Sequence, residues 1–271
     1  MSPRWHAPAI LSATIILSVL SAGATAFCLA PCRPVAGLRS GAISHLGWEG
    51  KIPRAARRTG NSMSVAETEV VWSKYWEDQV AAHAAKHVDN EGIFFITDAD
   101  EAMEKAIVAL EEINPTEKPG EWDDDAKAAK ISGRWEAMYA PHMAKLSSPF
   151  GVRFGPVRYT MGSDGDKRTI TSNVQYRSKL FGSGWLNAAG TYCSLDPSTV
   201  RIDFENFWWD PTERATPSDA PAPDAGGLVQ TLGTAGFLPS FSRFPVRYVS
   251  DDLCIFEFKL TGTNIVAVKK P

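Results

Sequence analysis

The feature that most constrains the fold is a change in sequence periodicity near residue 131. From there to the C-terminus, short runs of alternating polar and apolar side chains are separated by turn-forming residues. In residues 199–207, for example, Val200, Ile202 and Phe204 alternate with charged residues. Because successive side chains of a strand point to opposite faces, this pattern predicts half-buried β-strands.

Eight such strands are predicted, and their even spacing is typical of an antiparallel barrel or sandwich. They fall at residues 133–139, 151–160, 168–177, 185–194, 199–207, 243–249, 253–260 and 264–269. The fold class is therefore mainly β. The segment 211–227 is rich in Pro, Ala and Asp, and we expect it to form a mobile connector or a lid.

Two helices are predicted ahead of the strands, at residues 65–90 and 98–113. The first carries a stripe at helical spacing: Trp72, Trp76, Val80, His83 and His87. In the second, Asp98 and Glu101 have the spacing of a capping box. Because two helices cannot bury an aromatic stripe alone, we expect them to pack on the barrel or against a partner.

The first 61 residues differ in composition from the rest of the chain. They hold seven of the 28 Lys and Arg residues but one of the 31 Asp and Glu residues, which leaves 21 basic and 30 acidic residues in 62–271. An acidic mature chain argues against a nucleic-acid-binding surface. The hydrophobic content of 44 % argues against both bulk disorder and a polytopic membrane protein.

The leader begins with the pattern of a secretory signal peptide at residues 1–26. Arg4 precedes an apolar core, residues 10–20, and Ala24-Thr25-Ala26 fits a cleavage site before Phe27. An N-terminal membrane anchor is the alternative. Eleven residues span only about 16 Å as a helix, which is short for a hydrocarbon core of about 30 Å.

Residues 27–61 have transit-peptide chemistry, because they are basic, contain hydroxyl residues and have almost no acids. A signal peptide followed by such a segment, with Phe27 at the junction, resembles the bipartite leader of proteins sent to complex plastids of red-algal ancestry. This resemblance implies a location in the stroma or at the thylakoid or plastoglobule surface of a secondary plastid. A secreted protein is the alternative.

Cysteine usage agrees with a plastid location. Cys28 and Cys32 leave with the leader, and Cys193 and Cys254 are too few for the disulfide framework of a secreted domain. We expect each of the remaining two to be a buried apolar residue, with a disulfide between them as the less favoured alternative.

Several motifs of the mature chain resemble the plastid lipid-associated protein (fibrillin) family over about residues 112–270. Gly133-Arg134-Trp135 also resembles the start of a lipocalin barrel, where the tryptophan closes one end. In chain order the fibrillin-like motifs are Asn114-Pro115-Thr116, Gly133-Arg134-Trp135-Glu136-Ala137-Met138-Tyr139, Thr171-Ser172-Asn173-Val174-Gln175-Tyr176, Tyr248-Val249-Ser250-Asp251-Asp252-Leu253-Cys254-Ile255 and Asn264-Ile265-Val266-Ala267-Val268-Lys269-Lys270.

The resemblance implies a lipocalin-like barrel domain at 114–271, preceded by a helical segment at 62–113 for which we identify no family match. It also implies that the protein binds or stores apolar lipids at plastid membranes. One departure is clear. In the family, the leucine after the acidic pair usually precedes Arg-Ile, whereas Cys254 and Ile255 follow Leu253 here. A polar role of that arginine therefore does not carry over.

The parity of the strands predicts which side chains face the barrel interior. An eight-stranded barrel either fills its interior with side chains or holds one small ligand, and the sequence leaves both open. Aromatic linings suit an apolar ligand. The predicted interior residues are Trp135, Tyr139, Phe154, Tyr176, Phe204, Tyr248, Phe256 and Phe258.

Signals for catalysis or metal binding are weak. The chain has no glycine-rich phosphate loop, nucleophile elbow or HExxH motif. The acidic run 123–125 favours a solvated loop over a cation site, and His83 and His87 favour a solvated helix face over metal ligation. Asp251-Asp252 favours a turn over the acidic corner of the family. We therefore predict no catalytic residue, no metal and no cofactor.

Adjacent tryptophans at the end of a predicted strand, Trp208 and Trp209, must point to opposite faces. We expect one to be exposed as a membrane or partner contact, unless the following connector covers it. Trp72 and Trp76 on the first predicted helix are also candidate contacts for a membrane or a partner protein.

These observations favour a non-enzymatic protein that binds an isoprenoid quinone, a carotenoid or an acyl lipid. Membrane contact would be peripheral and would depend on exposed aromatic residues, since the mature chain is acidic. One alternative is a structural or assembly subunit of a photosynthetic complex, or a partner of a lipid-biosynthetic protein, docked through residues 65–112. A second is a lipocalin-like enzyme that acts on a lipid or carotenoid.

Overall fold

The computed structural model describes residues 65–96, 98, 100–114, 116–147, 151–179, 182–212, 229–231, 234, 242–259 and 261–271. The leader, with the cleavage site at Ala26 and Phe27, lies outside the described residues. So does nearly all of the connector expected at 211–227.

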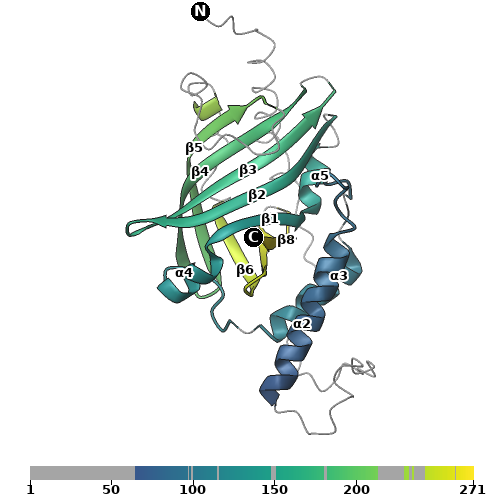
Figure 1. Cartoon of the computed structure of the whole chain (residues 1–271), viewed down its shortest axis with the longest axis vertical. Helices are drawn as coiled ribbons and strands as arrows, with labels where there is room; N and C mark the ends of the chain where they lie inside the picture. The colour runs from purple at the N-terminus through teal and green to yellow at the C-terminus, as the bar shows by residue number, and fades with distance from the viewer. Residues whose placement is uncertain are drawn as a thin grey trace, which may run out of the picture.

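The chain forms a closed antiparallel barrel in which eight strands follow one another in sequence order (Figure 1). The expected mainly β architecture is therefore present, and the barrel form holds rather than the sandwich. The strands are β1 (Gly133–Tyr139), β2 (Val152–Asp164), β3 (Lys167–Ser178), β4 (Gly182–Asp196), β5 (Thr199–Asp210), β6 (Arg243–Val249), β7 (Leu253–Phe258) and β8 (Thr263–Lys270).

The barrel is uneven, because β2 to β5 have 12 to 15 residues and the other strands have six to eight. The long strands continue past the short ones in Figure 1. As a consequence β5 and β6 share only three register pairs, between Thr199–Arg201 and Arg243–Pro245. We call this narrow contact the β5–β6 seam.

Two short helices, α4 and α5, lie at opposite ends of the barrel (Figure 1). The first, α4 (Asp125–Ile131), was not predicted, since the sequence indicated a polar connector there. Asp124 caps it by accepting hydrogen bonds from the backbone N–H groups of Ala126 and Lys127. The second, α5 (Pro141–Ser147), joins β1 to β2 at the opposite end.

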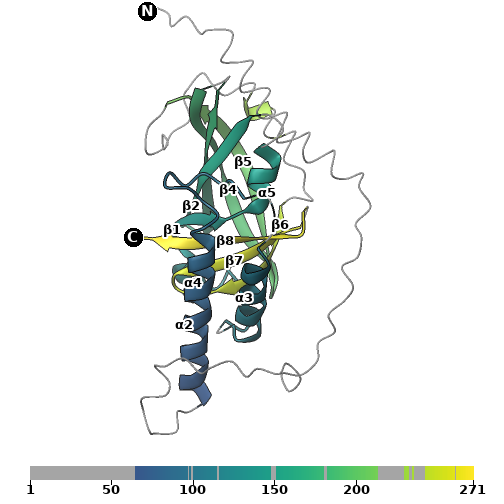
Figure 2. The ribbon, with the colours of Figure 1, turned by 90° about the vertical axis from the view of Figure 1, so that its right-hand side faces the viewer.

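Helices α2 (Val65–Ala84) and α3 (Glu101–Glu112) pack against each other and against the outer face of the barrel, in front of β7 and β8 in Figure 2. Buried Val80 of α2 meets Leu110 of α3, Ile255 of β7 and Val266 of β8 in one cluster. The N-cap of α3 is Asp100, so the capping box predicted from Asp98 is wrong.

Tyr139 and Tyr248 belong to this outer cluster, so their predicted interior position is wrong. A register shift precedes each of them, between Ala137 and Tyr139 in β1 and between Val246 and Tyr248 in β6. A bulge adds one residue to a strand, and the side chains beyond it change face. Both phenol rings therefore point to the helices instead of the interior.

Candidate functional site

The inner face of the barrel has a row of register partners in which small side chains lie between aromatic ones. Trp135 of β1 pairs with Tyr159 of β2, which pairs with Ser172 of β3. Ser172 pairs with Ala188 of β4, and Ala188 pairs with Phe207 of β5. Because Ser172 and Ala188 are short, the β3–β4 part of this wall leaves room in the interior.

Several inward aromatic side chains around this row are only partly buried. Tyr159, Phe204, Phe207, Phe244 and Phe258 all keep accessible surface, although they pack against the core clusters. In contrast, Trp135 next to Tyr159 is only 2 % exposed. Since β2 lies within the closed sheet, the accessible surface of Tyr159 indicates that the interior is not completely filled.

The buried ring of Phe256 connects some of these partly buried rings into an apolar wall. The ring centroid of Phe256 lies 6.2 Å from that of Tyr159 and 5.9 Å from that of Phe244. Phe244 in turn lies 6.4 Å from Phe258 in a stacked arrangement. Side chains of β2, β6 and β7 therefore form one aromatic group in the interior, and Phe204 and Phe207 line the strand next to β6, which is β5.

Besides the buried hydroxyl of Tyr192 near the α4 end, two further hydroxyl groups on this inner surface, those of Tyr159 and Ser172, have no partner within the described chain. No described residue hydrogen-bonds the Tyr159 hydroxyl or Ser172 Oγ, although the two residues are direct register partners. Burial raises the pKa of Tyr159 above its ordinary value. Both hydroxyls are therefore neutral donors that are free to bind a group in the interior.

Beyond the β5–β6 seam, the side chain of Gln230 hydrogen-bonds the backbone of β5. Gln230 Oε1 accepts a hydrogen bond from the backbone N–H of Phe207 at 2.8 Å. Gln230 Nε2 donates to the carbonyl oxygen of Glu205 at 2.6 Å. The Gln230 amide thus satisfies both polar groups that a neighbouring strand would satisfy. Among the described residues, these two side-chain bonds and one backbone bond, from the Ile202 N–H to the Ser242 carbonyl oxygen at 2.8 Å, hold the edge of β5 beyond the seam.

At the α5 end, His142 closes the interior over Phe258. The two rings stack with centroids 4.7 Å apart, and His142 Nδ1 lies 3.3 Å from Thr263 Oγ1. Burial lowers the pKa of His142 to about 4. The imidazole is therefore neutral at physiological pH.

The α4 end of the barrel is plugged by large side chains. Trp135 Nε1 donates to the carbonyl oxygen of Ile131 at 2.7 Å, and Trp122 meets Tyr192 edge to face at 5.7 Å. Lys269 Nζ lies 5.4 Å from the centre of the Trp135 ring and donates to the carbonyl oxygen of Lys130. Trp135 thus closes this end of the barrel.

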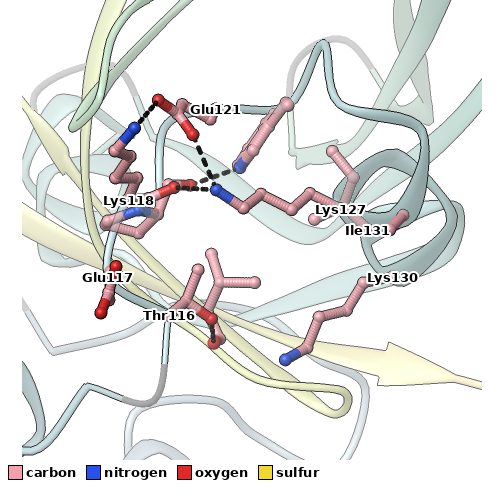
Figure 3. Close-up of a pocket in the computed structure, with 11 residues that line it drawn as sticks. Thr116, Glu117, Lys118, Glu121, Lys127, Lys130 and Ile131 are labelled. Atoms are coloured by element: carbon pink, nitrogen blue, oxygen red, sulfur yellow. Dashed lines mark hydrogen bonds and ion pairs between the residues drawn. The ribbon is translucent and has the colours of Figure 1, made fainter.

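A pocket of about 510 Å³ lies outside this plug, beside α4 (Figure 3). It contains Lys118, Lys127 and Lys130, which could attract an anion. However, Glu121 already holds Lys118 and Lys127, each at 2.9 Å, and Lys130 lies 3.6 Å from Asp251. The lysine charges are therefore largely compensated, and this pocket is a weaker candidate than the barrel interior.

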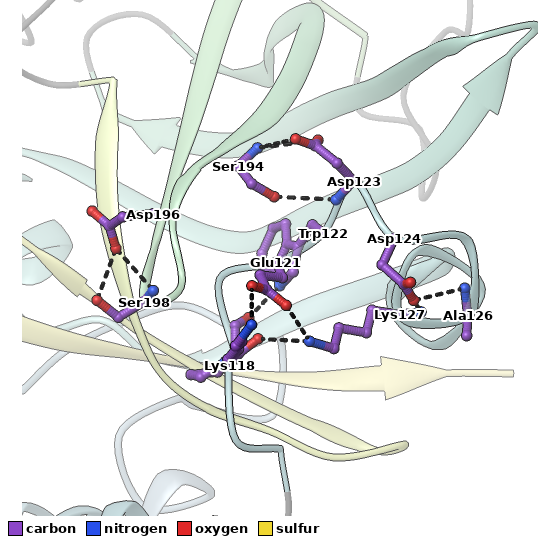
Figure 4. Close-up of polar contacts among 11 residues, drawn as sticks. Lys118, Glu121, Trp122, Asp123, Asp124, Ala126, Lys127, Ser194, Asp196 and Ser198 are labelled. Atoms are coloured by element: carbon purple, nitrogen blue, oxygen red, sulfur yellow. Dashed lines mark hydrogen bonds and ion pairs between the residues drawn. The ribbon is translucent and has the colours of Figure 1, made fainter.

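The acidic run 123–125 has three separate structural roles and does not converge on a cation; Figure 4 shows the contacts of Asp123 and Asp124. Asp123 accepts the backbone N–H of Ser194, Asp124 caps α4, and Asp125 pairs with Arg168. The sequence indicated a solvated loop here. In the structure these exposed acids lie at the N-terminus of α4 and hold it to β3 and β4. Asp251 and Asp252 form the expected turn, closed by the backbone bond from Ser250 to Leu253 at 2.8 Å.

His83 and His87 both lie near one carboxylate oxygen of Asp100. The predicted solvated position is wrong for His87, because its side chain is only 3 % exposed. Asp100 Oδ2 lies 3.3 Å from His83 Nδ1 and 3.4 Å from His87 Nε2. Burial lowers the pKa of His87 despite this carboxylate. Among the described residues, no group of three or more His, Cys, Asp or Glu side chains is arranged to hold a metal ion.

The structure divides the eight predicted interior residues into three groups. Trp135, Phe204, Phe256 and Phe258 face the interior as expected. Phe154 and Tyr176 lie in a separate cluster near the α5 end, where the Tyr176 hydroxyl accepts a hydrogen bond from Trp209 Nε1 at 2.8 Å. Tyr139 and Tyr248 face the helices. Contact of any of these residues with a ligand stays a prediction.

Sequence reasoning missed Tyr159, Phe207 and Phe244 as interior residues. For Tyr159 the cause is a register shift in β2 between Phe154 and Val157, which encloses Gly155-Pro156. A glycine and a proline inside a strand mark a bulge, so this dipeptide was the available signal. Phe207 follows a similar shift between Phe204 and Asn206 of β5.

Both adjacent tryptophans are buried, so the expectation that one is exposed is wrong; the alternative, that the connector covers it, falls on residues outside the described ones. Trp208 is 4 % and Trp209 is 8 % exposed. Trp209 packs in the cluster near the α5 end, and Trp208 pairs with buried Asn187 on the other face of the sheet. Trp72 and Trp76 are partly buried and meet Tyr75 edge to face at 5.8 and 5.1 Å.

Cys193 and Cys254 are both free, so the alternative of a disulfide between them is wrong. Burial raises the pKa of the Cys254 thiol to about 12, which makes it unreactive. Cys193 is only partly buried.

The chain matches no protein-family model, no curated protein and no solved structure. None of the helices among the described residues is both long and apolar enough to cross a membrane. The function must therefore be argued from the site itself.

Proposed function

We propose that this protein is a non-enzymatic, lipocalin-like lipid carrier that binds one apolar molecule inside its barrel. The observation that carries this proposal is the accessible surface of Tyr159, Phe204, Phe207, Phe244 and Phe258 on the inner face. Aromatic walls with a few polar groups are typical of sites for apolar ligands. The unpartnered hydroxyls of Tyr159 and Ser172 supply the polar groups.

Binding would depend on burial of the apolar chain, at about 0.8 kcal/mol per CH₂ group. Access would run through the β5–β6 seam, because only three register pairs join these strands. Local opening favours elements with few hydrogen bonds, and among the described residues two side-chain bonds of Gln230 and one backbone bond between Ile202 and Ser242 hold this edge.

The resemblance to the fibrillin family and the bipartite leader support a place for this carrier in a secondary plastid, at a thylakoid or plastoglobule surface. On this view the ligand is an isoprenoid quinone, a carotenoid or an acyl lipid. The mature chain is acidic, so membrane docking would rely on aromatic contacts more than on charge.

Native mass spectrometry of the purified full chain, followed by solvent extraction and lipid identification, tests the proposal. We expect one lipid per chain, and we expect the delipidated protein to take up the same lipid class from a plastid lipid extract. A chain that stays empty after both treatments contradicts the proposal. A lipid that returns chemically altered would support the enzyme alternative, with His142 as the first residue to replace.

A second function, docking to a membrane or a protein complex, is favoured by the middle of α2. Trp72, Tyr75 and Trp76 form a chain of edge-to-face contacts there, and Val70 of the same helix is 69 % exposed. The double variant Trp72→Ala, Tyr75→Ala should release the protein from plastid membranes or from its complex but retain bound lipid. If the variant lost both its membrane or complex association and its bound lipid, docking through α2 would not be independent of lipid binding.

A further inference from the structure

The polar groups of the barrel interior indicate which lipid head groups it can accept, and this inference rests on the proposed function. Besides the buried Tyr192 hydroxyl near the α4 end, the Tyr159 hydroxyl and Ser172 Oγ are unpartnered groups of the inner face, in the row that continues to the small residue Ala188. Both are uncharged hydroxyls. Each can donate one hydrogen bond to an oxygen of a ligand.

The cationic side chains that point toward the barrel interior already have partners. Among the described strands, two cationic side chains share the inward register: Arg168, two residues from Ile170 in β3, and Lys269, the partner of Trp135. Both lie at the α4 end. Arg168 pairs with Asp125, and Lys269 donates to the carbonyl oxygen of Lys130. Neither reaches toward Tyr159 as a free charge.

The histidine at the α5 end offers no charge either. Burial lowers the pKa of His142 to about 4, and its described neighbours are the uncharged Phe258 and Thr263. The interior between the two ends is therefore lined by apolar side chains and neutral hydrogen-bonding groups.

We propose that the barrel selects neutral lipids whose head carries a hydrogen-bond acceptor, such as a carbonyl or ether oxygen, seated on the Tyr159 hydroxyl. A free carboxylate would lose its hydration without gaining a counter-ion, and an unpaired charge in an apolar interior is strongly disfavoured. A carbonyl loses far less on transfer and regains one hydrogen bond. Neutral esters, quinones and ketones thus fit, and free fatty acids do not.

The geometry also orients the ligand. Tyr159 lies on β2, and the row from Tyr159 through Ser172 and Ala188 ends at Phe207 on β5, beside the seam. Three strand spacings of about 4.8 Å separate the two ends of this row. The polar head would lie at Tyr159, and the apolar tail would extend toward Phe207 and the opening.

Three probes with the same chain length separate the head group from the tail: methyl palmitate, palmitate and hexadecane. Their affinities for the full chain can be measured at pH 8 by displacement of the neutral dye Nile red. We expect methyl palmitate to bind at least 10-fold more tightly than palmitate. Tyr159→Phe should weaken methyl palmitate about 5- to 10-fold and leave hexadecane unchanged, since it removes one hydrogen bond and keeps the ring.

Thr160→Val is the matched control, because Thr160 follows Tyr159 directly, is exposed on the outer face and also loses one hydroxyl. It should change none of the three affinities, and circular dichroism should show that both variants are folded. Equal binding of palmitate and methyl palmitate overturns the inference but leaves the carrier function intact. Equal weakening of ester and hexadecane by Tyr159→Phe also overturns it. Failure of all three probes to bind overturns the proposed function itself.

Discussion

The Tyr248 hydroxyl donates a hydrogen bond to Glu77 Oε1 at 2.7 Å, and this bond joins β6 to α2. Ser73 Oγ of the same helix lies 2.8 Å from the hydroxyl. Tyr139 does the same for α3, because its hydroxyl donates to Glu104 Oε1 at 3.2 Å. Two tyrosines that bulges turn outward thus attach the two helices to the barrel.

Tyr248→Phe should therefore loosen α2 without disturbing the barrel. The free energy of unfolding should fall by about 1 to 2 kcal/mol, because Glu77 loses a partner at a site where its side chain is only 14 % exposed. Urea denaturation measures the change, and Tyr75→Phe should be neutral. An equal loss in both variants would show that the Tyr248 bond is not the cause.

A larger side chain at Ser172 tests whether the interior is hollow. In a filled core, Ser172→Leu would cost about 1 to 3 kcal/mol through overpacking. We expect the free energy of unfolding to stay within about 1 kcal/mol of the parent and lipid affinity to fall about 10-fold. Thr171→Leu, one residue away on the outer face, should leave lipid affinity unchanged. A large loss of stability in Ser172→Leu alone would indicate a solid core.

Replacement of Gln230 should open the β5 edge. Gln230→Ala removes the bonds to Phe207 and Glu205, so the backbone N–H of Phe207 should exchange with deuterium about 10-fold faster. Bound lipid should also dissociate faster, by stopped-flow transfer to vesicles. Thr231→Ala, at the next residue, is the comparison. Unchanged lipid release with faster exchange would place the access route elsewhere.

Acid should destabilise the protein through His142. Its folded pKa is about 4 and the unfolded value is about 6.5, so the unfolded chain binds the proton first. The contribution of His142 is complete above pH 6.5 and is lost as the pH falls to 4, by up to about 3 kcal/mol. The lowered pKa of His87 acts in the same direction. His142→Asn should flatten the stability curve over this range, and an unchanged slope would assign the effect to other groups.

The leader makes a cell-biological prediction. Residues 1–61 fused to a fluorescent protein should deliver it to the stroma of a red-derived plastid, and Phe27→Ala should retain it outside the inner membranes. Confocal imaging against stromal and outer-membrane markers distinguishes the two results. Secretion of both fusions would favour the alternative of a secreted protein.

The alternation of side chains predicted all eight strands to within a few residues at each end. This was possible because a strand with one buried face shows its period directly in the sequence. The same alternation assigned the wrong face to Tyr139 and Tyr248. A bulge in each strand turns the following side chains to the other face, and the residue types do not reveal it. It also excluded Tyr159, which reaches the interior only beyond the shift at Gly155-Pro156.

Local chemistry alone thus determined the mainly β class, the number of strands and the position of Trp135. Only the tertiary structure decided which tyrosines hold the helices and which face the interior, because register depends on pairing between distant strands. It also decided that Trp208 and Trp209 are both buried and that Gln230 closes the edge of β5. These outcomes depend on neighbours brought together by barrel closure, which no single segment encodes.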